Sequence, residues 1–91
     1  MFDKKQFLEN NRRDRILILS DILSNANHGI GISELICRVG LSSTQTNKYM
    51  PLLLKSQLLE TSVEKSRLLY KTTDKGKRFL EKTETLRKLI G

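Results

Sequence analysis

Hydrophobic residues in the first part of the chain recur at the three- and four-residue spacing of helices. The spacing predicts a first helix from about Lys4 to about Ser24, with Ile16, Leu19 and Leu23 on one buried face. The next stretch, residues 24–31, is polar and contains two glycines, which is typical of a loop.

Capping signals predict two more helices in quick succession. Ser33 has the place of an N-cap, and Gly40 has the place of a left-handed residue that ends a helix. Ser42 and Gln45 then have the spacing of a capping box, which predicts the start of a third helix. Two helices joined by a three-residue turn form a helix-turn-helix.

After the third helix the periodicity changes to that of strands. Leu59–Val63 and Arg67–Thr72 are predicted to pair as a hairpin, with residues 64–66 as the loop. Thr73 then has the place of an N-cap for a last helix, with Asp74 in its first turn. The predicted fold class is mainly α with a small β-hairpin, a winged helix-turn-helix.

The last helix carries a narrow apolar seam. Phe79, Thr83, Leu86 and Ile90 step by four, three and four residues, which is the spacing of a coiled coil and not of a broad core face. The seam predicts a coiled-coil homodimer, with Leu80 turned into the core of its own chain. We therefore divide the chain into a winged helix-turn-helix domain, residues 1–73, and a dimerisation helix, residues 74–91.

The third helix divides into two faces when each residue is given 100° of rotation. Tyr49, Met50 and Leu53 fall on an inward face. Pro51 lacks an amide hydrogen and its ring crowds the preceding turn, so we expect the helix to kink or loosen near Met50. The groove-facing part should then be residues 43–50.

The outward face of this helix carries Thr44, Asn47 and Lys48 and no carboxylate. Asparagine suits the adenine edge, lysine suits guanine or phosphate, and threonine offers a methyl group to thymine. Lys65 and Arg67 on the hairpin are expected to reach the DNA backbone or the minor groove. The predicted DNA-binding residues are thus Ser43, Thr44, Gln45, Asn47, Lys48, Lys65 and Arg67.

Each of these predictions has an alternative. Any amphipathic surface helix has a polar outside, and Gln45 can serve only to close the capping box. Glu64 stands beside Lys65 and weakens the attraction of the hairpin tip for phosphate.

Composition limits the function further. The 91 residues include 17 Lys and Arg against 10 Asp and Glu, a formal net charge of +7, which favours an anionic partner such as double-stranded DNA. A single cysteine, Cys37, and a single histidine, His28, exclude a disulfide framework and a multi-histidine metal site. We expect no enzyme activity and no cofactor, and no small-molecule ligand is evident from the sequence. The chain has no long apolar run, so we expect no membrane association and a cytoplasmic, nucleoid-associated location.

The block Tyr70-Lys-Thr-Thr73-Asp-Lys-Gly76-Lys-Arg-Phe-Leu80, together with the helix-turn-helix, carries a family resemblance. It resembles the small archaeal winged-helix proteins whose last helix dimerises as an antiparallel coiled coil, which include chromatin-associated DNA-binding proteins and predicted transcriptional regulators. The resemblance implies that the third helix and the wing contact DNA, and that the last helix pairs with a second copy as an antiparallel coiled coil. Two departures are Pro51 within the third helix and the end of the last helix at Gly91, which allows only a short coiled coil.

The sequence therefore predicts a DNA-binding protein, either a transcriptional regulator or a chromatin-associated protein. The main alternative is a winged-helix module that binds another protein and does not read DNA, because Leu52 and Leu54 flank the outward face of the third helix. Binding of the basic first helix to a membrane surface is a weaker alternative, because the core needs that helix's apolar face.

Overall fold

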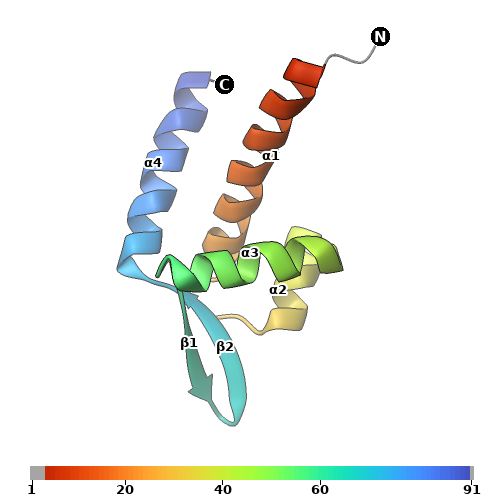
Figure 1. Cartoon of the computed structure of the whole chain (residues 1–91). Helices are drawn as coiled ribbons and strands as arrows, with labels where there is room; N and C mark the ends of the chain where they lie inside the picture. Colours follow the sequence, from red (N-terminus) through yellow and green to blue (C-terminus); the bar gives the residue numbers. More distant parts are fainter. Residues whose placement is uncertain (1–3, 91) are drawn as a thin grey trace.

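The structure is a computed structural model that describes the backbone of residues 4–90 and the side chains of residues 15–85, 88 and 89. Four helices and one hairpin follow the predicted order (Figure 1). The elements are α1 (Lys4–Asn25), α2 (Ile32–Val39), α3 (Ser43–Lys55), β1 (Leu59–Glu64), β2 (Arg67–Thr72) and α4 (Asp74–Ile90).

The core lies where the helices meet the base of the hairpin. Its fully buried members include Ile22 and Leu23 of α1, Leu35 of α2 and Leu53 of α3. From this core α1 and α4 extend in the same direction and contact each other, while the hairpin extends the opposite way (Figure 1). Ile16 was predicted to share the buried face of α1, but it is 43% exposed, because this part of α1 lies beyond the core.

The start of α2 differs from the prediction. Gly31, and not Ser33, is the N-cap, and no side chain caps this helix. Ile30, just before it, is paired with Tyr70 in β2 through hydrogen bonds of 3.0 and 2.8 Å between their amides and carbonyls. This pairing fixes the chain in an extended form up to Gly31, so the helix begins at once after the bridge. The end of α2 is as predicted, with Gly40 in the left-handed region at φ 78°.

The wing is an antiparallel hairpin with a tighter turn than predicted. Glu64 pairs with Arg67, so Glu64 belongs to β1 and the loop contains only Lys65 and Ser66. Both loop residues have positive φ, 52° and 64°, as in a type I′ turn. That turn matches the natural twist of the two strands, which explains its use here by residues other than glycine and asparagine.

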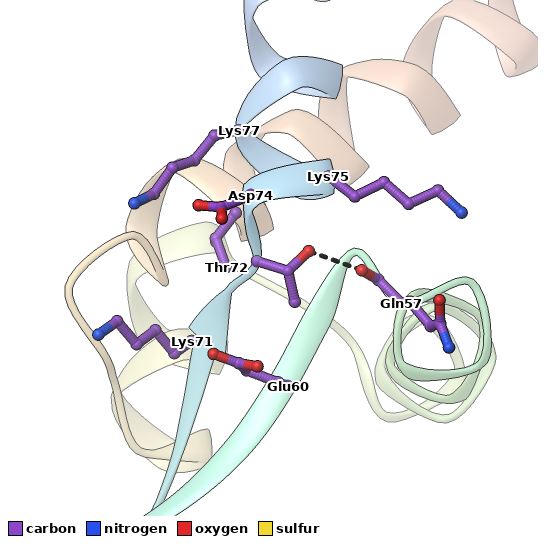
Figure 2. Close-up of a pocket in the computed structure, with 8 residues that line it drawn as sticks. Gln57, Glu60, Lys71, Thr72, Asp74, Lys75 and Lys77 are labelled. Carbon is purple, nitrogen blue, oxygen red and sulfur yellow. Dashed lines mark hydrogen bonds between the residues drawn. The ribbon is translucent and has the colours of Figure 1, made fainter.

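Two consecutive threonines at the end of β2 tie three segments together. The Thr72 hydroxyl is buried and donates to the carbonyl oxygen of Leu23 at 2.6 Å, at the end of α1. The Thr73 hydroxyl donates to the carbonyl oxygen of Gln57 at 2.6 Å, the bond drawn dashed in Figure 2. The Thr73 amide donates to the carbonyl oxygen of Leu58 at 3.1 Å. The chain after α3, the end of α1 and the start of α4 are thereby held at one junction.

Thr73 also begins α4, as predicted. Its hydroxyl accepts a hydrogen bond of 3.1 Å from the amide of Gly76, which is the usual pattern for an N-cap. Gly76 lies so close to the preceding segments that an added β-carbon would collide with the carbonyl oxygen of Leu58 and lie 2.5 Å from Cγ2 of Thr72. The first turn of α4 therefore requires a glycine at this position for reasons of space and not of backbone angle.

We expect Gly76→Ala to lower the free energy of unfolding by about 1–3 kcal/mol, because the methyl group forces the junction apart. Alanine alone would favour the helix by about 1 kcal/mol, so a net loss can only come from the collision. Gly31→Ala is the control for a methyl group added outside the junction: this group meets only the end of the flexible Arg67 side chain, at 3.3 Å, so the loss should stay below about 1 kcal/mol, the preference for glycine over alanine at an N-cap. Urea denaturation measures both; a Gly76→Ala protein as stable as the parent would contradict the prediction.

Candidate nucleic-acid interface

The inward face of α3 fixes the helix to the core. Tyr49, Met50 and Leu53 are buried, as predicted. The expected loosening at Pro51 is not observed, because α3 continues through Pro51 to Lys55. Proline removes only one hydrogen bond, to the carbonyl of Asn47, and the buried side chains before and after it keep the helix in place.

The outward face of α3 is open to solvent. Thr44, Asn47 and Lys48 are all exposed, and Pro51 and Lys55 continue the same face. The Lys48 ammonium nitrogen lies 5.7 Å from the centre of the Tyr49 ring, a cation–π distance that steadies the ammonium beside the helix. Residues 42–55 contain no carboxylate, so nothing on this helix repels a phosphate.

The start of α3 is organised by the predicted capping box. The Ser42 hydroxyl accepts from the Gln45 amide at 3.1 Å, and the Gln45 side-chain oxygen accepts from the Ser42 amide at 3.0 Å. Gln45 therefore closes the capping box with its side-chain oxygen, and a contact of Gln45 with DNA stays a prediction. The amides of Ser43 and Thr44 donate to no acceptor in the part of the chain that the structure describes. Free amides at a helix start can bind a phosphate.

The two basic residues of the wing that were predicted to contact DNA lie differently. Lys65 is exposed in the turn at the tip. Arg67 is exposed too, but its guanidinium lies near Gly31, because a β-carbon built there would be 3.3 Å from Nη2. Lys65 therefore extends the wing outward, while Arg67 lies back toward the start of α2.

An apolar pair on the wing was not predicted from the sequence. Val63 and Leu68 are 71% and 52% exposed and stand directly opposite each other on β1 and β2. The alternation of side chains along the strands indicates that the two residues lie on one face, the face that also carries the buried Leu59 and Thr72. The two side chains are exposed because the hairpin extends beyond the helices (Figure 1).

The predicted dimer seam is only partly described. Phe79 packs against the core of its own chain, and so does Leu80, as expected for Leu80. Thr83 is 5% exposed within the single chain, and its hydroxyl donates to the Phe79 carbonyl at 2.8 Å. The side chains of Leu86 and Ile90 lie outside the described residues. The seam therefore stays a prediction.

A polar hollow of about 470 Å³ lies beside the junction, between the base of the wing and the start of α4 (Figure 2). Lys71 and Lys77 face it together with Glu60 and Asp74, so both signs of charge meet there. Among the described residues no group of histidine, cysteine, aspartate or glutamate is placed to hold a metal ion. Within the same residues, no helix has the length and apolar character needed to span a membrane.

The fold and the sequence together identify the class of protein. The family model described as winged helix-turn-helix matches residues 12–91, and the chain belongs to this family. No curated protein sequence gives a significant match.

Three solved structures resemble the chain. The DNA-binding protein Sso10a-2 from Sulfolobus solfataricus is 31% identical with a TM-score of 0.71, over 81% of this chain and 78% of that one. Bordetella bronchiseptica BpsR, whose DNA binding is regulated by 6-hydroxynicotinic acid, is 12% identical with a TM-score of 0.63, over 97% and 76%. A predicted DNA-binding transcriptional regulator from E. coli is 18% identical with a TM-score of 0.56, over 96% and 99%. The last two share the fold.

The capping box gives a direct test of how α3 is held. We expect Ser42→Ala to lower the free energy of unfolding by about 1 kcal/mol, because the Gln45 amide loses its acceptor. Ser43→Ala, one residue later, is the matched control and should change stability little, because the Ser43 hydroxyl caps nothing. Urea denaturation compares the two variants; equal losses would show that the cap does not hold the helix start.

Proposed function

We propose that the protein binds double-stranded DNA as a transcriptional regulator or chromatin-associated protein, with α3 in the major groove and the wing beside it. The observation that carries the proposal is the joint exposure of Thr44, Asn47 and Lys48 on a helix whose other face is buried. A major groove is wide enough to admit a helix presented in this way.

The chemistry of the exposed face fits DNA. Asn47 offers a donor and an acceptor to adenine, and Lys48 offers donors to guanine or to phosphate. The free amides of Ser43 and Thr44 add a place for a phosphate at the start of the helix. The net charge of +7 attracts the duplex as a whole.

The similar proteins support the proposal. Sso10a-2, at 31% identity, is described as a DNA-binding protein. The proteins from Bordetella and E. coli share only the fold, and both are described in terms of DNA binding.

We further propose that the protein is a homodimer that pairs through the end of the predicted α4 seam, at Leu86 and Ile90, because Phe79 and Thr83 of that seam already pack within their own chain. Support comes from the part of the α1–α4 pair that lies beyond the core, where Ile16, Leu17 and Leu89 are exposed. A second copy would cover apolar surface there that this chain leaves in water.

A protein-binding module is the second candidate function, and one observation favours it. Leu52 is 45% exposed at the edge of the outward face of α3, where it would suit an apolar contact with a protein. DNA is preferred because the residues around it, Lys48 and Lys55, are basic.

The DNA proposal predicts that Asn47→Ala combined with Lys48→Ala weakens binding at least about ten-fold, because base and phosphate contacts are both lost. The charge reversal Lys48→Glu should weaken it further. Lys82→Ala is the control, since it removes the same charge from an exposed position on α4. Gel shifts with genomic duplex fragments measure the change. Equal binding by the double variant and the parent would exclude α3 as the helix that reads DNA. A protein captured from a lysate by the parent but not by a Leu52 variant would favour the second candidate, a protein-binding module.

The dimer proposal predicts that Leu86→Asp halves the mass observed in sedimentation, because a buried carboxylate without a partner opposes pairing. Glu84→Gln, an exposed change on the same helix, serves as the control. A Leu86→Asp protein with the parent's mass would remove the α4 seam from the proposal.

A further inference from the structure

The exposed apolar pair Val63 and Leu68 has no role in the fold. The two residues stand opposite each other, directly before and after residues 64–67, which form the tip of the wing. At 71% and 52% exposed, they are among the most exposed large hydrophobic side chains described. Side chains that face each other in this way touch across a strand pair and present one continuous apolar surface.

The same face of the wing has two different environments along its length. At its base, Leu59 and Thr72 are each 2% exposed and belong to the core region. Toward the tip, Thr61 is exposed and Tyr70 half-buried, and the Val63–Leu68 pair lies past them in solvent. Apolar residues on this face thus continue beyond the part of the wing that packs against the protein's own core.

Charge distinguishes this face from the opposite one. Glu60 and Glu64, the two carboxylates of the hairpin, alternate with Thr61 and Val63 and so lie on the other face. The face with the apolar pair carries no charged residue, and Lys65 stands at the tip beside it. It can therefore approach a phosphate backbone without bringing a carboxylate toward it.

We propose that Val63 and Leu68 form an apolar wedge that enters the minor groove of DNA and opens a base step; this rests on the proposed DNA-binding function. When α3 occupies a major groove, the next groove along the duplex is a minor groove, about 6 Å wide, which side chains at a hairpin tip can enter. Apolar side chains inserted there partly unstack a step and kink the duplex. Lys65 beside the wedge would hold the flanking phosphate.

A second copy of the chain is the weaker occupant for this surface. A stable protein interface buries about 800 Å² from each partner, far more than two side chains at a hairpin tip can offer. A groove also supplies negative charge on both sides of the cationic residue at the tip.

The experiment replaces both residues by threonine, Val63→Thr with Leu68→Thr, which keeps strand-forming side chains but removes apolar surface. Fluorescence energy transfer between the ends of a short duplex reports the bend, and titration at several salt concentrations reports affinity. We expect a smaller bend and about ten-fold weaker binding at every salt concentration, with the parent's slope of log affinity against log salt, because apolar contacts release no counterions.

Two further variants serve as controls. Val63→Ile with Leu68→Ile keeps the pair apolar and should bind and bend as the parent does. Lys65→Ala should instead make the salt slope shallower by about 0.9, because one phosphate contact is lost. Urea denaturation of each variant checks that the fold is retained.

The possible results distinguish failure of the wedge from failure of the proposed DNA-binding function. A threonine variant that binds and bends DNA as the parent does overturns the wedge and leaves the proposed function standing. A threonine variant with altered sedimenting mass also overturns it, because the pair would then join protein copies. If the parent binds no duplex at all, the proposed function fails and the wedge fails with it.

Discussion

The arrangement of the helices and the wing depends on the junction that Thr72, Thr73 and Gly76 form. Their hydrogen bonds reach the end of α1, the turn after α3 and the first turn of α4. The missing side chain at Gly76 allows α4 to start against the carbonyl of Leu58. Because the hydroxyl and backbone groups involved are satisfied over such short distances, the segments have little freedom to move relative to one another. The Thr-Thr and Gly positions of the family-like block thus have a structural reason.

This junction determines how α3 is presented. With its C-terminal end tied to Thr73 through Gln57 and Leu58, and its N-terminal end capped by Ser42, the helix is fixed at both ends. The buried face of α3 packs against the core and fixes the helix further. Apart from Gln45 in the capping box, the side chains of the outward face therefore make no contact that the fold requires. A rigidly held surface that the fold does not use is suited to binding, because little conformational entropy is lost when a partner binds.

The wing adds a second kind of contact to the first. The face of α3 is polar and basic, whereas the wing combines one cation at its tip with an apolar pair on one side. Electrostatic attraction is long-ranged and does not discriminate among sequences, while base contacts and deformation of the duplex do. In the proposed mode the two elements would divide these tasks, with charge bringing the duplex close and the side chains of α3 and the wing acting at short range.

The sequence by itself determined the order of elements, the helix-turn-helix, the capping box at Ser42 and the outward set Thr44, Asn47 and Lys48, because periodicity and capping are local properties. It could not place the start of α2, since pairing of Ile30 with the distant Tyr70 replaced the cap expected at Ser33. It also misjudged Pro51, because packing on either side outweighed one lost hydrogen bond. Only the tertiary structure decided the exposure of Ile16, Val63 and Leu68, because apolar residues at regular spacing give the same sequence pattern whether or not another element packs over them.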